Sequence, residues 1–274
     1  ADKHDVELAE MGKFTNYGYF EATYEGETVA SLDLEFLHDG FPSYQLEAVW
    51  EEREREEPVL DDSIDHEKSI LDILSRVNVA SKEWIQRQYD HEVQGSSVIK
   101  PLVGDAGIKS DASVFKPLDE SSKGLALALA NCFKYSQIDP YWMAACSLEE
   151  SIRRVVSVGA DPSTITLNDN FCWPNSIYDQ EDNPEGKRNL GKLVRANKAL
   201  YEFTKEFGTP CVSGKDSMFI DGNIPDEEGD LHKVSGLPAL QFAALGQLDK
   251  VEKAVNLRPK RSGDLVYIAG LTRD

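Results

Sequence analysis

Alternating apolar and polar positions predict a β-hairpin near the start of the chain. Aromatic and β-branched residues dominate 14–24, a second run at 28–34 follows, and Glu25-Gly26 between the two runs has the chemistry of a turn. The later stretch 47–57 is mostly Glu and Arg at helical spacing. Such a composition is typical of a solvated surface helix or a linker.

Beyond Pro58 the apolar spacing becomes helical. A cluster of carboxylates stands at the expected helix start, where it suits the positive end of the helix dipole. These acidic residues are Asp61, Asp62 and Asp65, and the apolar face that follows is Ile70, Leu71, Leu74 and Val77. A second helical stretch is expected over 81–89, before a loop at Gly95.

Strands and helices alternate along the rest of the chain. The run Gly-Leu-Ala-Leu-Ala-Leu-Ala at 124–130 predicts a buried strand. Helices are expected over 141–158 and 187–207, ended by Gly159 and Gly208. Further strands are predicted at 164–167, 210–213, 240–245 and 265–269. This order indicates an α/β domain in which the helices cover a mixed sheet.

The charge balance narrows the range of partners. The 274 residues include 29 Lys and Arg against 49 Asp and Glu, which gives a net charge of −20. The negative electrostatic field of such a chain repels phosphate backbones and anionic membranes, so neither nucleic acid nor membrane is an expected partner. The four cysteines form no C-x-x-C pair, and no leader or long apolar run is present. These features favour a cytoplasmic protein with free thiols.

Two glycine-containing segments have residues that suit phosphate and cation binding. In the first, Gly104-Asp105-Ala106-Gly107, small residues admit a close backbone approach and Asp105 can hold a divalent cation. The second is 212–218, and its candidate residues are Gly214, Lys215, Asp216 and Ser217. Gly214 permits close approach, and Lys215 supplies a point charge for phosphate. Asp216 can bind Mg²⁺, and Ser217 is a neutral donor. Each segment also fits an ordinary polar turn.

A third polar run, 167–175, contains Asn168 and Asp169 and is expected at the carboxyl end of a strand, where α/β folds place ligands. Turns favour the same residue types. The pairs Glu149–Arg153 and Glu150–Arg154 have the i,i+4 spacing of helix-surface salt bridges. The five histidines form no triad or metal-ligand pair, and only His91 lies in a dense polar motif.

Seven motifs follow one another in a fixed order between residues 82 and 218. They are 82–95, 104–107, 123–127, 139–141, 158–162, Asn170-Phe171 and Gly214-Lys215-Asp216-Ser217-Met218. In this order and spacing they resemble the phosphoribosylformylglycinamidine synthase family. The likeness extends to nearly the whole chain, because it also includes the hairpin and residues 37–40, 263–267 and 271–274.

The resemblance implies an α/β fold of the aminoimidazole ribonucleotide synthetase type. Residues 1–60 would be the C-terminal part of a preceding synthetase-like domain, and 61–95 a helical linker. Residues 96–250 would be a synthetase-like N-terminal domain of the ATP-binding kind, with a mixed sheet and flanking helices. Residues 251–274 would begin the following C-terminal domain. The abrupt end after the strand expected at 265–269 also indicates a fragment of a longer protein.

The family that the chain resembles makes purines. Its reaction uses ATP to join ammonia from glutamine to formylglycinamide ribonucleotide. ATP first phosphorylates an amide oxygen of the substrate, and the nitrogen attacks afterwards. Positioning and charge neutralisation therefore determine the rate. The resemblance implies ATP and Mg²⁺ as cofactors. It implies as partners the remaining synthase domains, a glutaminase domain or subunit, and a second copy at the exposed sheet. The family's catalytic histidines lie outside this chain, so we assign no catalytic residue and expect the fragment to be inactive alone.

The resemblance also assigns roles to particular residues. Nucleotide contacts fall on Asp105, Asn168, Asp169, Gly214 and Lys215, a substrate contact on Ser217, and metal ligands on Asp105, Glu150 and Asp216. A lysine cannot ligate Mg²⁺, so Lys215 is expected to pair with phosphate directly. The sequence departs from the family pattern at Ala130, Arg154 and Leu167, where Asp, Asn and Asp are expected.

Two alternatives remain open. Ala130 and Arg154 favour a non-catalytic nucleotide-binding half that serves as a scaffold, whereas Lys215 and Ser217 favour a contribution to an active site. A different ATP-using relative, such as a selenophosphate synthetase or the aminoimidazole enzyme itself, would begin with its own glycine-rich segment. The hairpin and linker take that place here.

Overall fold

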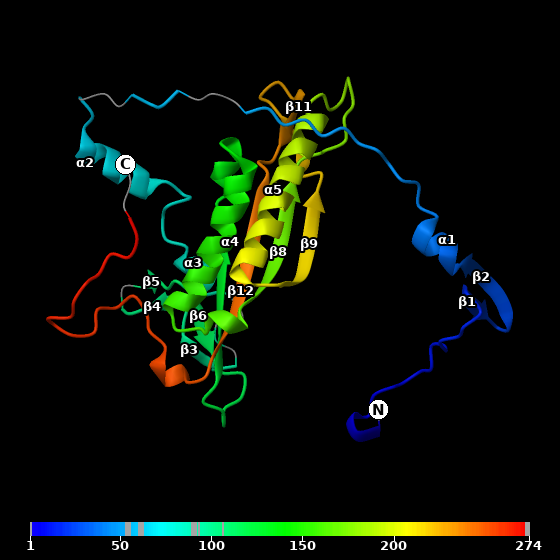
Figure 1. Ribbon diagram of the computed structural model, residues 1–274, viewed down its shortest axis with the longest axis horizontal. Helices are drawn as coiled ribbons and strands as arrows, with labels where there is room; N and C mark the ends of the chain where they lie inside the picture. Colours follow the sequence, from blue (N-terminus) through cyan, green and yellow to red (C-terminus); the bar gives the residue numbers. More distant parts are fainter. Residues whose placement is uncertain are drawn as a thin grey trace. The chain divides into compact units, whose positions relative to one another are not determined.

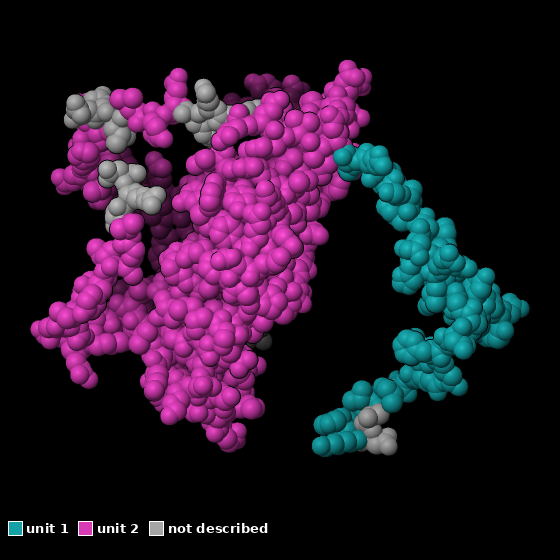
Figure 2. All heavy atoms as spheres, in the orientation of Figure 1, with its two compact units in different colours: residues 1–46 teal, residues 47–274 magenta. Residues whose placement is uncertain are grey.

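The chain forms two compact units, residues 1–46 and 47–274 (Figure 2). In this computed structural model the described residues are 2–52, 56–59, 63–88, 92, 94–105 and 107–271. The division into four parts at residues 60, 95 and 250 stays a prediction. Among the described residues, no helix combines the length and the apolar character that crossing a bilayer requires.

The first unit contains the predicted hairpin. Strand β1 (Tyr19–Tyr24) pairs antiparallel with β2 (Glu27–Asp33), and the turn between them places Glu25 and Gly26 at φ 51° and 86°. Helix α1 (Leu34–Asp39) follows, and the Asp33 carboxylate caps it by accepting from the amides of Glu35 and Phe36. A short 3-10 helix, η1 (Asp2–His4), precedes the hairpin.

The second unit begins with an extended segment, 47–52, which we call the strap. The strap contains no helix or strand. Its Val49 amide donates to the Lys187 carbonyl at 3.0 Å, and Glu47 pairs with the Lys187 ammonium at 2.6 Å. The surface-helix interpretation is therefore wrong for these residues, and the linker interpretation stays a prediction.

Two short helices follow the strap. Helix α2 (His66–Ser75) starts at Asp65, whose carboxylate accepts from the Lys68 amide. The predicted acidic partners Asp61 and Asp62 lie outside the described residues. Helix α3 (Glu83–Gln86) is shorter than the predicted stretch 81–89, and Tyr89 also lies outside the described residues.

A six-stranded mixed sheet organises the second unit (Figure 1). Its order is β3 (Ser97–Ile99), β6 (Ser113–Phe115), β7 (Gly124–Ala130), β12 (Ala239–Leu248), β8 (Thr166–Trp173) and β9 (Cys211–Met218). Neighbouring strands are antiparallel except β8 and β9, which are parallel. Two small hairpins lie outside it: β4 (Leu102–Val103) with β5 (Ile108–Lys109), and β10 (Asp221–Pro225) with β11 (Leu231–Ser235).

Two long helices start and end close to their predicted positions. Helix α4 (Pro140–Ser157) has Pro140 in its first turn and is capped by Asp139, while Gly159 follows its end at φ 108°. Helix α5 (Gly186–Phe207) ends at Gly208, which has the left-handed conformation that glycine tolerates. The 3-10 helices are η2 (Phe133–Gln137), η3 (Pro162–Thr164) and η4 (Val251–Lys253).

The core lies between the sheet and these two helices, which run side by side over one sheet face (Figure 1). Small side chains on the sheet let the helices approach closely. The buried sheet residues include Ala126, Ala128, Leu167, Phe171, Phe242 and Ala244, and the helices contribute Met143, Leu148, Val155, Ala196 and Ala199. On the opposite face of β7, Leu127 and Leu129 are 42% and 53% exposed. The sheet is thus covered on one side by the helices and open on the other.

The strands near the candidate residues differ from their predicted extents. β8 runs to Trp173 and β9 to Met218, so both polar segments lie within strands and not in turns at strand ends. Pairing from Asn168–Ser213 to Trp173–Met218, beyond a register shift between Leu167 and Asn168, outweighs the low β-propensity of Asn, Asp and Gly there. The strand predicted at 265–269 is wrong, because these residues form no strand and Leu265, Val266 and Tyr267 are exposed. The β10–β11 hairpin was not predicted.

The packing of α4 predicts unequal costs for two leucine truncations. Leu148 is fully buried in the core, so Leu148→Ala should lower the free energy of unfolding by about 2–5 kcal/mol. Leu129→Ala is the matched control on the open face and should cost less than about 1 kcal/mol. Chemical denaturation measures both. Equal losses would contradict the assignment of the covered and open faces.

Candidate functional site

The parallel pair β8–β9 brings two of the predicted polar segments side by side. In the register of this pair, Asn168 lies opposite Ser213, Asp169 opposite Gly214, and Asn170 opposite Lys215. Residues from 168–170 and 213–217, more than forty positions apart in sequence, therefore share one part of the sheet.

Strand alternation divides these residues between the two sheet faces. Asp169, Gly214 and Asp216 lie on the same face as the buried Phe171, which packs toward the helices. A Cβ atom on Gly214 would lie 2.7 Å from the Asp169 carboxylate, which shows how closely the two strands approach there. The open face carries Asn168, Asn170, Lys215 and Ser217, which we call the polar face.

The polar face offers a cation and several neutral hydrogen-bonding groups. The Lys215 ammonium contacts the Ser217 hydroxyl, and Lys215 is exposed. The Asn170 Oδ1 atom is buried and has no hydrogen-bond partner among the described residues. An ammonium binds phosphate as a point charge, while hydroxyl and amide groups recognise neutral oxygens and nitrogens. This set is chemically suited to a phosphorylated or amide-containing ligand.

Asp169 and Asp216 form an acidic pair on the other face. Burial raises the pKa of Asp169, and repulsion from Asp216 raises it further. The Cys211 thiol donates to Asp169, and burial followed by this carboxylate raises the pKa of Cys211 to about 11. A cation placed between the two carboxylates would relieve their repulsion.

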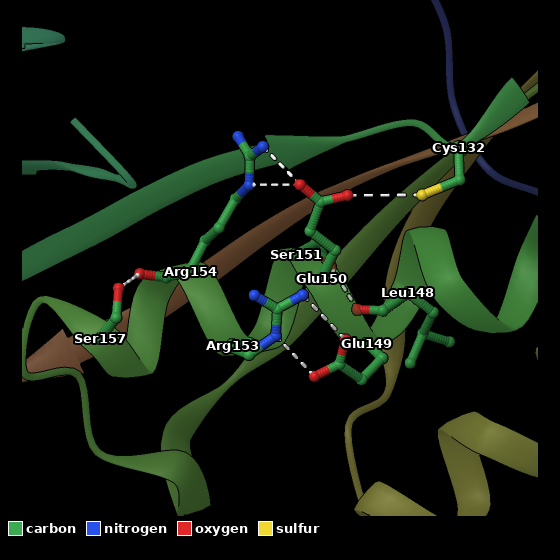
Figure 3. Close-up of polar contacts among 8 residues, drawn as sticks. All are labelled: Cys132, Leu148, Glu149, Glu150, Ser151, Arg153, Arg154 and Ser157. Carbon is green, nitrogen blue, oxygen red and sulfur yellow. Dashed lines mark hydrogen bonds and ion pairs between the residues drawn. The ribbon is translucent and has the colours of Figure 1, made fainter. Parts of the chain in front are cut away.

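Glu150 occupies a separate cluster on α4, shown in Figure 3. Its Oε1 atom accepts from two guanidinium nitrogens of Arg154, with Nε at 2.9 Å, and its Oε2 atom lies 3.4 Å from the Cys132 thiol. A third nitrogen of Arg154 donates to the Leu129 carbonyl at 3.2 Å. The second predicted pair, Glu149–Arg153, also forms, at 2.8 Å.

The Glu150 cluster is partly buried and electrostatically closed. Burial alone would raise the pKa of Glu150, but the hydrogen bonds from Arg154 and Cys132 outweigh it and hold that pKa below its usual value. Burial, assisted by the hydrogen bond to Glu150, raises the pKa of Cys132 to about 11. Both side chains of the ion pair are 25% exposed. Arg154 thus already provides the positive charge that a cation would bring to Glu150.

Asp105 is placed by a tight turn between β4 and β5. Gly104 and Gly107 flank it at φ 71° and 61°, Asp105 itself is exposed, and Ala106 lies outside the described residues. The predicted metal ligands Asp105, Glu150 and Asp216 therefore come from a hairpin turn, a helix and a strand. Within the described part of the chain, no three His, Cys, Asp or Glu side chains come together in a group that could hold a metal. These three carboxylates do not build a single metal centre.

Asn170 is the residue of the polar face that the sequence assignments omitted. It lies two positions beyond Asn168, so strand alternation would have placed both on one face once 167–173 was recognised as a strand. Asn170 received no role because Asn-Asp-Asn was interpreted as turn chemistry. His91 lies outside the described residues.

Comparison with known proteins shows which proteins the chain is similar to. Residues 109–230 match the family model for the AIR synthase related protein, N-terminal domain. The phosphoribosylformylglycinamidine synthase subunit PurL of Picrophilus torridus is 32% identical over 272 residues, covering 98% of this chain and 34% of that protein. The chain spans about a third of the length of the curated relatives it matches.

Solved structures share the fold. PurLQS from Thermotoga maritima superposes with a TM-score of 0.55 at 20% identity, covering 90% of this chain and 34% of that one. T. maritima PurL complexed with ADP gives a TM-score of 0.53 at 20% identity, with coverages of 89% and 33%. Over nearly its whole length, the chain is a relative of the PurL subunit of phosphoribosylformylglycinamidine synthase, and its residues 109–230 match the AIR synthase related protein, N-terminal domain.

Proposed function

We propose that this chain provides one synthetase-like domain of a phosphoribosylformylglycinamidine synthase. The complete enzyme would convert formylglycinamide ribonucleotide, ATP and glutamine-derived ammonia to formylglycinamidine ribonucleotide, ADP and phosphate. The observation that carries this proposal is the relationship to PurL along 98% of the chain. T. maritima PurL, which shares the fold, has been solved in complexes with ADP and with FGAR.

The polar face is the surface that we assign to ligand contact. Lys215 would pair with a phosphate group, because its ammonium is exposed and extends from an edge strand. Ser217 would hydrogen-bond the substrate through its hydroxyl on the polar face, and Asn170 through its side-chain amide, whose Oδ1 atom is buried and has no partner among the described residues. Asn168 completes the polar face, while Gly214 stays a predicted nucleotide contact whose Cβ position faces Asp169 on the other side of the sheet.

Charge neutralisation is the chemical contribution open to these residues. In the proposed reaction the substrate amide oxygen attacks the terminal phosphorus of ATP, and ADP leaves. Ammonia then adds to the amide carbon, and that oxygen departs as phosphate. Lys215 would offset negative charge on the transferred group, while Ser217 and Asn170 would orient the amide. We assign proton transfer to no residue of this chain.

Magnesium would enter this site with the nucleotide. Mg²⁺ in nucleotide sites is usually held by one or two carboxylates together with phosphate oxygens. Asp169 and Asp216 lie on adjoining strands and repel each other, so a cation would relieve that repulsion, but they are on the helix-covered face and would not share the cation with a phosphate held by Lys215 on the polar face. Glu150 does not fit, since Arg154 and Cys132 engage both of its oxygens. The exposed Asp105 stays a predicted nucleotide and metal contact.

The proposal also covers the partners and the location predicted from the sequence. The exposed Leu127 and Leu129 favour a second sheet over the open face, supplied by another domain of the synthase or by a second copy. A glutaminase domain or subunit would deliver ammonia. The cytoplasm remains the proposed compartment.

A scaffold role is the second candidate function. The observation that favours it is the Glu150–Arg154 pair, because a carboxylate already neutralised by an arginine is a poor site for a metal-bound nucleotide. In that case the domain would bind a nucleotide for stability or shape the enzyme without touching the substrate.

Replacing Lys215 should weaken nucleotide binding. We expect Lys215→Ala to reduce ATP affinity by at least about tenfold, because it removes a charge-assisted contact to phosphate. Lys198→Ala on α5 removes the same charge at an exposed position and is the control. Calorimetry with and without Mg²⁺ measures both. Equal affinity for the two variants would exclude Lys215 from the nucleotide site.

Ser217 separates the catalytic from the scaffold role. In the full-length synthase that contains this domain, Ser217→Ala should reduce turnover of formylglycinamide ribonucleotide with the fold unchanged by circular dichroism. Undiminished turnover would favour the scaffold.

The chain by itself should show no turnover of formylglycinamide ribonucleotide with ammonia and ATP, because we assign the proton-transfer groups to other domains. Measurable product from the isolated chain would overturn that assignment.

The Glu150 cluster predicts the reactivity of one cysteine. Because the pKa of Cys132 is about 11, its thiol should alkylate slowly with iodoacetamide at about pH 8. Glu150→Gln removes the neighbouring carboxylate charge and should speed that reaction. Mass spectrometry resolves each cysteine, and Cys211, whose raised pKa involves Asp169, is the internal control. An unchanged rate at Cys132 would contradict its contact with Glu150.

A further inference from the structure

A glutamine stands in the middle of the sheet, on the face that the helices leave open. β12 lies between β7 and β8, and its residues Leu240 and Phe242 are fully buried on the helix side. Strand alternation therefore places Gln241 on the open face, between Ala239 and Ala243. Nothing in the proposed function uses this residue.

The register of the sheet joins Gln241 to the polar face. Gln241 lies opposite Asn170 on β8, and Asn170 lies opposite Lys215 on β9. Opposite residues of an antiparallel pair have Cβ atoms about 5 Å apart, and their side chains stand on the same face. Three polar side chains thus form one row across three neighbouring strands, from the centre of the sheet to its edge.

The packing of the sheet gives no reason for a glutamine at this position. Gln241 is half-buried, and its side chain makes no hydrogen bond to another described residue. A half-buried amide without a partner costs stability, and strands favour β-branched and aromatic residues instead. Within the described part of the chain, neither amide atom of Gln241 is among the fully buried polar atoms that lack a partner. The amide can therefore be reached from the open face.

Gln241 is also separate from the apolar part of the open face. Leu129 lies opposite Ala243, and Leu127 pairs with β12 two positions further along. Both leucines therefore flank the other half of β12. A partner seated on them would leave Gln241 with the polar face.

The chemistry of a side-chain amide suits another amide. The NH₂ group of Gln241 can donate to a carbonyl oxygen, and its own oxygen can accept from an N–H group. The substrate in the proposed function, formylglycinamide ribonucleotide, contains two amides. One is the glycinamide whose oxygen is phosphorylated, and the other is the formamido group beyond it. Gln241 is one strand further from Lys215 than Asn170 is, so it is placed for the second amide.

We propose that Gln241 is a specificity-determining residue that hydrogen-bonds the formamido group of the substrate. The inference rests on the proposed function, because it extends the ligand from the polar face toward the centre of the sheet. Lys215 and Ser217 then engage the reacting end of the substrate, and Gln241 binds the amide that does not react. Such a contact stabilises the bound substrate and the transition state equally, so its loss raises KM and leaves kcat unchanged.

Steady-state kinetics of the full-length synthase that contains this domain test the proposal. Gln241→Leu should raise the KM for formylglycinamide ribonucleotide by about tenfold, because one or two hydrogen bonds are lost, with kcat and the KM for ATP unchanged. Gln241→Met is a second variant of similar length. Gln247→Leu is the matched control, since Gln247 lies on the same face of β12 but beyond the residues that pair with β8.

A substrate analogue without the formyl group tests the assignment to the formamido end. The wild-type synthase should use formylglycinamide ribonucleotide in preference to this analogue, measured as a ratio of kcat/KM values. That ratio should fall by about tenfold in Gln241→Leu and stay unchanged in Gln247→Leu. An unchanged ratio in Gln241→Leu would contradict the contact with the formamido group.

Chemical denaturation of the chain separates a binding role from a folding role. Gln241→Leu should leave the free energy of unfolding unchanged or raise it, because leucine suits a half-buried strand position better than an unpaired amide does. A lower free energy of unfolding in both Gln241→Leu and Gln241→Met would assign the residue to folding and overturn the proposal.

The kinetic outcomes distinguish this inference from the proposed function. An unchanged KM in both Gln241 variants, with turnover reduced in Ser217→Ala, overturns the inference and leaves the assignment of the polar face intact. Unchanged kinetics in all three variants overturns both.

Discussion

The parallel pairing of β8 with β9 is the constraint on which the candidate site depends. Parallel neighbours cannot be joined by a tight turn, so the chain must cross the sheet between them, and α5 is that crossover. The register then fixes every facing residue. A slip of one position would move Lys215 and Ser217 to the helix-covered side and Asp216 to the open side. The buried Phe171 and Trp173 hold β8 in place, because their side chains have no alternative position of similar burial.

Local cations give the acidic chain its specific chemistry. Arg154 and Arg195 each form paired hydrogen bonds with one carboxylate, Glu150 and Asp139, and each does so where a helix meets the sheet or the strap. A bidentate arginine satisfies a partly buried carboxylate without a metal. Lys215 differs, because it lies on an exposed edge strand and its ammonium contacts the Ser217 hydroxyl and not a carboxylate. The same charge is structural in the first two cases and available for a ligand in the third.

The sequence predicted the elements well where hydrophobic periodicity and end signals agree. α4 and α5 combine long apolar faces with a terminal glycine, and β7 alternates without interruption, so each was placed within a few residues. β8 and β9 were truncated, because Asn168, Asp169 and Gly214 suggest turns when no partner strand is known. Cross-strand pairing is a tertiary property, and local propensity does not contain it. The same reason explains the wrong strand at 265–269, where apolar residues stand without a paired strand among the described residues.

The composition of the open sheet face limits which part of it a partner can cover. Leu127 and Leu129 on β7 make one part of that face apolar, whereas Asn168, Asn170, Lys215 and Ser217 make the β8–β9 part polar. A partner that buried the whole face would strip water from the Lys215 ammonium, which costs several kcal/mol for an unpaired ion. A partner over β7 and β12 alone would bury the leucines and leave the polar part open to solvent. The composition of the face therefore favours a covering partner that stops short of β9, and the polar face then stands at the margin of that contact.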